Sequence, residues 1–586
     1  MMNVRRESLK DEVSRMRKPP LPIGIEFYKH MMDKPYYYVD KTLIIRDLLD
    51  KGGKVNLFTR PRRFGKTLIQ STLRVFFECE TEADGSVTDN SHYFAGAKIM
   101  QAGEEYVAHM GQYPVIFLSL KSAKQPNFQM AYEQLRETIA EEFERHAYLL
   151  KIGGMSDGNR EKYRELMERR AQRSDYATAL YFLSKCLKQY HGKDVVILID
   201  EYDVPLENAH FRGFYDEMID FIRSLFESAL KTNECLELAV ITGCLRISRE
   251  SIFTGLNNLK VASVLDESFA EYFGFTPGEV KEMLEYYGIG DREEEVRRWY
   301  DGYLFGQTEV YNPWSVINYV DDIISKNTPF PRPYWSNTSS NSIVRELVDR
   351  ADDTVKSELE ELIAGGAVEK PVHEEITYGE VYKSQDNLWN FLFFTGYLKA
   401  ASRRFAGNTV YLTLTIPNEE ICYIYQNTIR EWFEERKKEY DPTPFYDGMR
   451  SGDCSKVEEF ISSQLSGSIS YYDSTESFYH GYLLGLLGGM GGYKISSNRE
   501  QGNGRPDLLL EAHDPRRPSM IIEIKRARKF SEMEGMCDEA LAQIERQDYA
   551  AELLDEGYRK IYQYGFCFCK KSCMVKFSQI GDSRQA

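Results

Sequence analysis

Five runs of consecutive apolar residues dominate the first half of the chain, and each run has the length of a strand. They cover residues 55–59, 113–120, 195–200, 236–242 and 259–265. Between the runs, apolar positions recur every three or four residues, as in 130–150, which predicts amphipathic helices. Apolar strands that alternate with helices are typical of a parallel sheet covered on both faces. The pattern therefore predicts an α/β domain, to which we assign residues 19–265.

The pattern changes after this first domain. Residues 266–375 are helical and acidic, with aromatic turns between the helices, which predicts a helical lid. Residues 376–446 run as a helix, two short strands and a second helix, a winged-helix-like order. We see no basic cluster there, so packing between domains is favoured over contact with DNA. A smaller α/β unit is predicted at 447–586, and the polar residues 1–18 form a leader.

Composition and charge narrow the class of protein. Of the 586 residues, 42% are hydrophobic and 28% are charged, which is the balance of an ordinary globular chain. The 74 Lys and Arg residues against 91 Asp and Glu residues give a formal net charge of −17. Any contact with nucleic acid must therefore come from a local basic patch, and a histone-like binder is excluded.

The sequence also predicts a location. No apolar stretch approaches the ~20 residues that a membrane-spanning helix needs. The charged N-terminal residues lack the apolar core of a secretory signal. Ten cysteines are few for a chain of this length, and a reducing compartment would keep them as thiols. We therefore expect a cytoplasmic protein without disulfides and without a membrane partner.

A candidate phosphate-binding loop follows the first strand. Residues 60–67 read Arg-Pro-Arg-Arg-Phe-Gly-Lys-Thr and lead into a helix. In a P-loop, backbone N–H groups hold the phosphates, the Lys reaches the terminal phosphates and the Thr hydroxyl binds Mg²⁺. Arg60 stands where the full pattern has glycine, so a basic loop entering a helix is the alternative. The predicted nucleotide-binding residues are Arg63, Phe64, Gly65, Lys66, Thr67 and Leu68.

The third apolar run ends in two acids, Asp200 and Glu201. This is the Walker B arrangement, in which the first acid supports Mg²⁺ and the second polarises a water. The fourth run ends in Thr242, where P-loop ATPases often place a polar group near the γ-phosphate. Together these positions favour nucleotide binding and hydrolysis. Arg246 and Arg249 are candidates to stabilise the transition state, with ordinary surface arginines as the simpler interpretation.

A second candidate site lies near the C-terminus. Two strand-like runs, 504–510 and 520–525, are joined by a turn, with Asp507 on the first and Glu523 and Lys525 on the second. Residues two apart on a strand point to one face. An Asp, a Glu and a Lys that converge in this way suit metal-dependent phosphodiester cleavage. The two carboxylates would hold Mg²⁺, and the Lys would add a positive charge beside the attacking water.

Flanking segments extend this second site. A helix with Glu476 and His480 precedes the two strands, and a helix with Gln543 and Tyr549 follows them, which is the element order of a nuclease core. Glu476 is predicted to bind the metal and Gln543 to belong to the catalytic group. His480 either lines the site or pairs with Glu476 structurally. The basic run 525–529 is either a phosphate-binding patch or a solvated helix start.

Three cysteines near the end of the chain, Cys567, Cys569 and Cys573, are candidates for a metal site. A structural zinc site needs four ligands, and no fitting fourth ligand lies nearby in the sequence. Their alternation within an apolar run instead predicts thiols in the core of a strand.

Together these motifs resemble the bacterial and archaeal AAA-ATPase-like proteins with a C-terminal nuclease of the PD-(D/E)XK superfamily. Segments that carry the resemblance include RPRRFGKT at 60–67, LIDEYD at 198–203, YDGYLFG at 300–306, GRPDLLL at 504–510 and EIKRA at 523–527. The resemblance spans nearly the whole chain after residue 19. It implies a P-loop NTPase domain whose loop tolerates a missing first glycine, followed by a nuclease domain.

The resemblance also implies cofactors and roles. ATP and Mg²⁺ would bind at Lys66, Thr67, Asp200 and Glu201. The nuclease centre would be formed by Asp507, Glu523 and Lys525.

Two hypotheses about function remain open at this point. In the first, the protein is an ATP-regulated nuclease that acts on nucleic acid, with DNA favoured, in defence or mobile-element biology. In the second, it is an ATP-dependent switch or nucleic-acid-binding module whose nuclease fold does not cleave. The presence of all three nuclease residues favours the first hypothesis. A homo-oligomer is left open.

Overall fold

The computed structural model describes residues 18–581, apart from a set of internal segments. Those segments are 152–154, 232, 247–251, 254–256, 327–329, 336–352, 364, 374–383, 437–440, 469–475 and 498–505. Contacts divide the chain into two compact units. The larger unit comprises Met1–Ser339 and Glu369–Glu420, and the smaller comprises Ser340–Val368 and Ile421–Ala586.

The larger unit is built on a parallel sheet of five strands. In chain order these are β1 (Val55–Thr59), β2 (Val115–Ser119), β3 (Val195–Asp200), β4 (Leu236–Gly243) and β5 (Leu259–Ala262). They lie in the order β2-β3-β4-β1-β5, and every neighbouring pair is parallel. All five predicted strands are present, and β1 and β3 are buried at every position. Burial on both faces explains why these strands show no alternation of polar residues.

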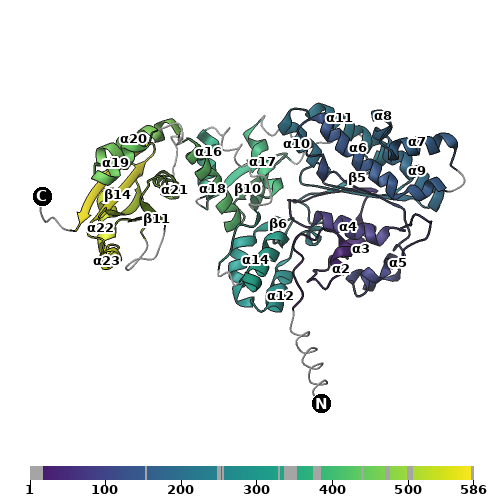
Figure 1. Cartoon of the computed structure of the whole chain (residues 1–586), viewed down its shortest axis with the longest axis horizontal. Coiled ribbons are helices and arrows are strands. Elements are labelled where there is room, and N and C mark those ends of the chain that lie inside the picture. The colour runs from purple at the N-terminus through teal and green to yellow at the C-terminus, as the bar shows by residue number, and fades with distance from the viewer. Residues whose placement is uncertain are drawn as a thin grey trace, which may run out of the picture. The chain divides into compact units, whose positions relative to one another are not determined.

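Helices cover both faces of this sheet. Figure 1 shows α6 and α11 on one side and α3 and α4 on the other. Helix α4 (Lys66–Phe77) starts at the candidate phosphate loop, and α6 (Phe128–Arg145) is the helix predicted at 130–150. The other α-helices of this region include α2 (Tyr28–Met32), α3 (Ile44–Lys51), α5 (Glu104–Val107), α7 (Asp157–Met167), α8 (Arg173–Ala177), α9 (Ala179–His191), α10 (Val204–Arg212) and α11 (Tyr215–Phe226). None of the helices in the described part of the chain is long and apolar enough to cross a membrane.

A group of helices with one apolar core follows the sheet. It contains α12 (Pro277–Tyr287), α13 (Glu293–Tyr300) and α14 (Pro313–Lys326). Between the last two helices runs a short hairpin of β6 (Tyr303–Phe305) and β7 (Thr308–Val310), paired antiparallel. The sequence predicted only helices here, because strands of three residues are too short to show a period of two.

The predicted order of helix, two strands and helix is present in the next region. Its elements are α17 (Gln385–Thr395), β9 (Lys399–Ala406), β10 (Thr409–Thr415) and α18 (Glu419–Arg436). A further strand, β8 (Val368–Pro371), pairs with β10, which gives a small sheet in the order β8-β10-β9. The prediction missed this third strand because it lies in the segment assigned to the lid.

The smaller unit contains a mixed sheet of five strands. Its helices are α16 (Asp353–Ile363), α19 (Thr443–Ser451), α20 (Cys454–Ser468), α21 (Glu476–Leu487), α22 (Met533–Arg546) and α23 (Ala551–Asp555). Its strands are β11 (Tyr493–Ser497), β12 (Leu508–Ala512), β13 (Ser519–Arg526), β14 (Ile561–Cys569) and β15 (Ser572–Ile580), which lie in chain order. Only β13 and β14 are parallel, and α22 connects them. Because α22 ends at Arg546, Tyr549 lies in the turn beyond it, and its placement on that helix was wrong.

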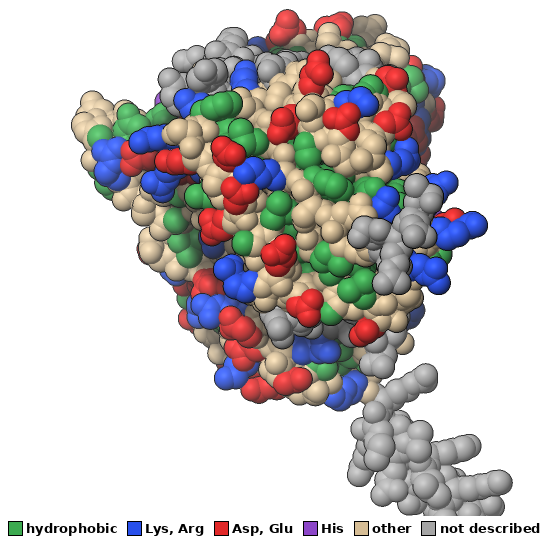
Figure 2. All heavy atoms as spheres, turned by 90° about the vertical axis from the view of Figure 1, so that its left-hand side faces the viewer, with side chains coloured by type: hydrophobic (Ala, Val, Ile, Leu, Met, Phe, Trp, Pro, Cys, Tyr) green, Lys and Arg blue, Asp and Glu red, His purple; other side chains and the backbone are tan. Residues whose placement is uncertain are grey.

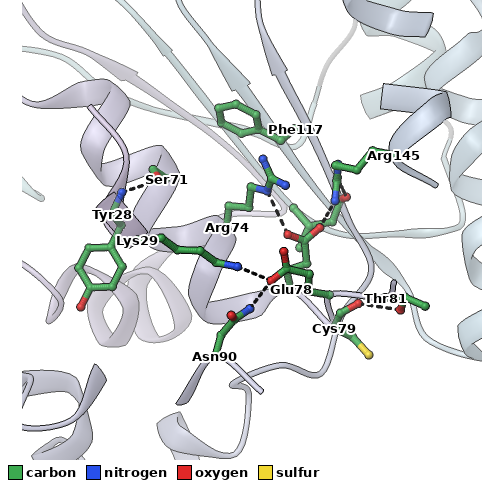
Figure 3. A network of polar contacts seen from close by, with 12 residues as sticks. Tyr28, Lys29, Ser71, Arg74, Glu78, Cys79, Thr81, Asn90, Phe117 and Arg145 are labelled. Atoms are coloured by element: carbon green, nitrogen blue, oxygen red, sulfur yellow. Dashed lines mark hydrogen bonds and ion pairs between the residues drawn. The ribbon is translucent and has the colours of Figure 1, made fainter. Parts of the chain in front are cut away.

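A buried ionic cluster fixes the end of α4 that lies away from the phosphate loop. Glu78 directly follows the helix, is 4% exposed, and accepts hydrogen bonds from Arg145 and, at 3.0 Å, from Arg74. Figure 3 shows Glu78 between these two guanidinium groups. Arg145 ends α6 and also donates from Nε to Glu142 at 2.9 Å. Burial alone would raise the pKa of both carboxyls, but the neighbouring cations, with Arg145 foremost, together outweigh it, and both pKa values are lowered.

We predict that Arg145→Met lowers the free energy of unfolding by about 3–5 kcal/mol, because it leaves buried carboxylates without their shared cation. Urea denaturation near neutral pH measures this. A carboxyl whose pKa is lowered by folding stabilises the fold above its ordinary pKa of about 4.3, and that contribution is lost as the pH falls below it. The difference in the free energy of unfolding between the wild type and Arg145→Met should therefore become smaller at acid pH. Arg170→Met, at an exposed arginine, should leave stability nearly unchanged.

Candidate functional site

The candidate phosphate loop connects β1 to α4. Gly65 precedes the helix with a φ of 81°, in the left-handed region that glycine adopts without strain. Lys66 is 6% exposed, and its Nζ donates to the backbone carbonyls of Arg60 at 3.0 Å and Pro61 at 2.9 Å. The ammonium therefore lies inside the loop, at the N-terminus of a helix whose first N–H groups are available to an anion.

Arg60 explains how the loop is built without its first glycine. The residue does not adopt a positive φ, so glycine is not required at this position. Its guanidinium is fully buried and donates to the carbonyls of Thr59 at 2.9 Å and Ala262 at 2.8 Å. It also lies 4.9 Å from the centre of the Phe305 ring. Burial lowers the pKa of Arg60 to about 9, which leaves it charged at neutral pH.

The next two predicted residues of the loop contact the elements that follow the sheet. The Arg63 guanidinium lies 4.5 Å from the centre of the Trp314 ring in α14. The ring of Phe64 is fully buried and packs edge-on against Tyr303 in β6, at 5.0 Å between centroids. The loop is therefore held by its own side chains as well as by the sheet.

Three predicted residues meet at the carboxyl ends of β3 and β4. Asp200 is fully buried, and its Oδ2 accepts a hydrogen bond from Thr67 Oγ1 at 2.8 Å. Its Oδ1 accepts from Thr242 Oγ1 at 2.6 Å. The hydroxyl of Thr67 and the carboxylate of Asp200 form an all-oxygen donor pair at the start of α4. Such a donor set fits Mg²⁺, which prefers oxygen ligands.

Glu201 follows Asp200 and has a positive φ of 53°. Burial raises the pKa of Glu201, and the nearby charge of Lys66 opposes that rise. The sequence analysis missed a third acid of this segment, Asp203, which is 2% exposed. Its Oδ2 accepts from the backbone N–H groups of Cys244 at 2.8 Å and Leu245 at 3.1 Å. Asp203 therefore holds the segment after β4 beside the phosphate loop, and its place three residues after Asp200 was the available signal.

A cavity of about 340 Å³ lies beside this loop. Its lining includes the loop residues 62–68, Leu68 among them, and Glu201. Residues of the N-terminal segment and of the region after the sheet also line it, including Tyr37, Tyr38, Val39, Phe275, Trp314 and Ile317. The cavity is therefore lined by both cationic and aromatic side chains. Arg246 lies in the segment that directly follows β4, and Arg249 lies outside the described residues.

In the smaller unit, β12 and β13 bring the second predicted set together. Asp507 directly precedes β12, and its Oδ2 accepts from the backbone N–H of Ile524 at 2.8 Å. Lys525 Nζ donates to Glu523 Oε1 at 3.3 Å, so these two side chains share one face of β13 as predicted. Gln543 of α22 donates from Nε2 to the same Glu523 oxygen. Four of the predicted residues therefore converge from three elements.

The electrostatics of this set suit a cation. Glu523 is 2% exposed, and its Oε2 has no hydrogen-bond partner among the described residues. Burial, followed by the charge of Asp507, raises the pKa of Glu523 to about 7, and Lys525 opposes the rise. An unpartnered buried carboxylate oxygen beside a second acid fits a divalent ion. Within the described residues, no third His, Cys, Asp or Glu joins a metal-binding group, and the side chain of Glu476 lies outside them.

The other residues that the sequence analysis considered for this site contact neighbouring parts of the fold. His480 Nε2 lies 2.8 Å from the backbone oxygen of Asp507 and 3.1 Å from Ser497 Oγ, so it supports the start of β12. Burial raises the pKa of Tyr549, which lies near Gln543. Cys567, Cys569 and Cys573 are buried free thiols as predicted, but Cys573 lies on β15 and the other two on β14, so their placement on a single strand was wrong.

Comparisons with known proteins assign the two candidate sites to two different domains. Residues 22–253 match the family model described as a predicted AAA-ATPase, and residues 474–578 match the model of the PD-(D/E)XK nuclease superfamily. The chain therefore carries a predicted AAA-ATPase-like domain and, at its C-terminus, a PD-(D/E)XK nuclease superfamily domain.

One curated relative is similar over part of its length. It is the "Uncharacterized protein in vnfD 5'region" of Azotobacter chroococcum mcd 1, which is 29% identical over 335 residues. The match covers 57% of this chain and 57% of the relative. No solved structure matches the chain.

We predict that Thr242→Val destabilises the larger unit by about 1–3 kcal/mol, because it removes the hydroxyl that satisfies one oxygen of the buried Asp200 carboxylate. Thr242→Ser is the matched control, since it keeps the hydroxyl and loses only a methyl group. Urea denaturation of both variants measures the difference. Equal stability of the Val and Ser variants would contradict a role for this hydrogen bond.

Proposed function

We propose that the protein binds and hydrolyses ATP with Mg²⁺ in its larger unit and cleaves nucleic acid, with DNA favoured, in a Mg²⁺-dependent reaction in its smaller unit. The proposal rests on two features: the contacts among Thr67, Asp200 and Thr242 beside a cavity, and the convergence of Asp507, Glu523, Lys525 and Gln543. Free thiols and a need for ATP fit a cytoplasmic protein. Cleavage of foreign DNA fits a role in defence or mobile-element biology.

The nucleotide half of the proposal assigns a role to each group. Lys66 offsets phosphate charge, and the N–H groups at the start of α4 bind phosphate oxygens. Thr67 and Asp200 would hold Mg²⁺, which neutralises charge on the phosphates. Glu201, whose pKa is raised by burial, orients and polarises the attacking water. Aromatic side chains of the cavity lining accommodate the base.

Lys66→Ala should lose ATP affinity by about tenfold or more, because hydrogen bonds to charged groups contribute ~1.5–3 kcal/mol. Glu201→Gln should bind ATP as the wild type does and hydrolyse it at least ~100-fold more slowly, since it keeps the shape and removes the base. Calorimetry and phosphate release measure the two effects. ATP binding that survives Lys66→Ala unchanged would rule out the proposed phosphate site.

The nuclease half assigns Asp507 and Glu523 to the metal. Mg²⁺ bound there would activate a water and stabilise charge on the phosphate. Lys525 adds positive charge beside the attacking water, and Gln543 orients Glu523 through its amide. Glu476, at the start of α21, is proposed as a further metal ligand.

Asp507→Asn and Glu523→Gln should each abolish Mg²⁺-dependent cleavage of DNA, because each removes a carboxylate charge from the metal site. Asp514→Asn is the matched control, since Asp514 is an acid in the turn between the same two strands and pairs with Arg516. Gel analysis of labelled DNA with and without Mg²⁺ measures cleavage. A wild type that binds DNA and leaves it intact would support the non-cleaving module instead.

A further inference from the structure

The hairpin of β9 and β10 presents an unusual surface. Residues 401–405 of β9 are all exposed, so both faces of this part of the strand meet solvent. Phe405 is 69% exposed, although burying a phenylalanine side chain stabilises a fold by about 1.5–3 kcal/mol. β9 is also an edge strand in the order β8-β10-β9. A single exposed apolar side chain is common on protein surfaces, so what Phe405 can bind depends on the residues beside it.

The hairpin is basic, whereas the chain as a whole is acidic. Residues 399–415 contain Lys399, Arg403 and Arg404 and no Asp or Glu, against a net charge of −17 for the chain. Elsewhere charges are mixed, and Figure 2 shows acidic and basic side chains interspersed over one face of the molecule. These three cations do not share one face of the strand. Lys399 lies near Asp301, and the neighbours Arg403 and Arg404 point to opposite faces.

The two neighbouring arginines differ in their surroundings. Arg404 forms two hydrogen bonds with Glu369, at 3.0 and 2.8 Å, and stacks on Tyr411 at 4.8 Å from the ring centre. Its charge is therefore neutralised locally. Arg403 lies 5.1 Å from the centre of the Phe405 ring, and no carboxylate of the described residues pairs with it. An exposed cation and an exposed aromatic ring thus stand side by side on β9.

We propose that this hairpin binds single-stranded nucleic acid, with Arg403 on a backbone phosphate and Phe405 stacked on an unpaired base. Proteins that bind single strands combine cationic side chains along the backbone with aromatic rings on which bases stack. Duplex DNA fits less well, because its bases are already stacked and Phe405 would have no base face to contact. This inference rests on the proposed action on nucleic acid and adds a binding surface separate from Asp507 and Glu523.

The test uses full-length protein without divalent metal, so that no cleavage occurs, and a fluorescein-labelled oligothymidylate of about 20 nucleotides, longer than typical site sizes. Fluorescence anisotropy gives Kd for wild type, Arg403→Ala, Phe405→Ala and Arg404→Ala. Each is measured at salt concentrations from about 50 to 200 mM, because every phosphate contact contributes to the salt dependence. Thermal unfolding checks that each variant is folded, which the exposure of all three side chains favours.

Phe405→Ala should weaken binding about tenfold with an unchanged salt dependence, since stacking on a base involves no ion release. Arg403→Ala should weaken binding and reduce the slope of log K against log salt by about 0.7, the value for one phosphate of a single strand. Arg404→Ala removes the same charge from the next position and should change neither the affinity nor the salt dependence. The losses of affinity in Arg403→Ala and Phe405→Ala should be smaller when the ligand is a duplex of the same length.

Two results would overturn the inference while leaving the proposed function intact. One is wild-type affinity in both Arg403→Ala and Phe405→Ala, which would point to an acidic protein as the partner of the hairpin. The other is an equal loss in Arg404→Ala and Arg403→Ala, which would indicate a diffuse electrostatic effect. A wild-type protein that binds neither single-stranded nor double-stranded DNA or RNA would instead contradict the proposed function, and this inference would fail with it.

Discussion

The buried carboxylate of Asp200 is the interaction on which the larger unit's site depends. A carboxylate taken out of water is costly unless both oxygens are satisfied. Here the two hydroxyls that satisfy them come from Thr67 at the start of α4 and Thr242 at the end of β4. The requirement to pair one buried charge therefore fixes the phosphate loop relative to two strands. Parallel strands make this arrangement available, because their carboxyl ends meet at one edge of the sheet.

The phosphate loop is also part of the core beyond the sheet. Arg60 donates to the carbonyls of Thr59 at the end of β1 and Ala262 at the end of β5 and lies against Phe305, and Phe64 packs on Tyr303. A glycine-rich loop gains its shape from backbone freedom, whereas this loop gains it from side chains anchored on both sides. Any change in the loop's conformation must therefore repack the aromatic residues of β6. This is a physical link between the candidate nucleotide site and the helical region that follows the sheet.

The smaller unit also contains a buried carboxylate, Glu523, but its hydrogen bonds differ from those of Asp200. Glu523 is nearly as buried as Asp200, yet one of its oxygens has no hydrogen-bond partner among the described residues, and its pKa is raised to about 7. Lys525 and Gln543 satisfy the other oxygen. A fold rarely leaves a buried carboxylate oxygen unsatisfied, and such positions usually serve a ligand or a reaction. The two acids thus differ: both oxygens of Asp200 are paired by hydroxyls, whereas Glu523 keeps one oxygen unpaired among the described residues.

The amino-acid sequence by itself determined the parallel sheet, the two strands β12 and β13, and the identity of both candidate sites. It did so because runs of apolar residues indicate buried strands, and because Lys66, Asp200, Asp507 and Glu523 stand within or close to such runs in recognisable motifs. Only the tertiary structure decided the burial of Arg60, the role of Asp203 and the contact of Gln543 with Glu523. It also decided that Arg404 is paired and Phe405 is exposed. Each of these depends on residues distant in the chain, such as Ala262 or Glu369, and local patterns carry no information about which distant side chains will meet.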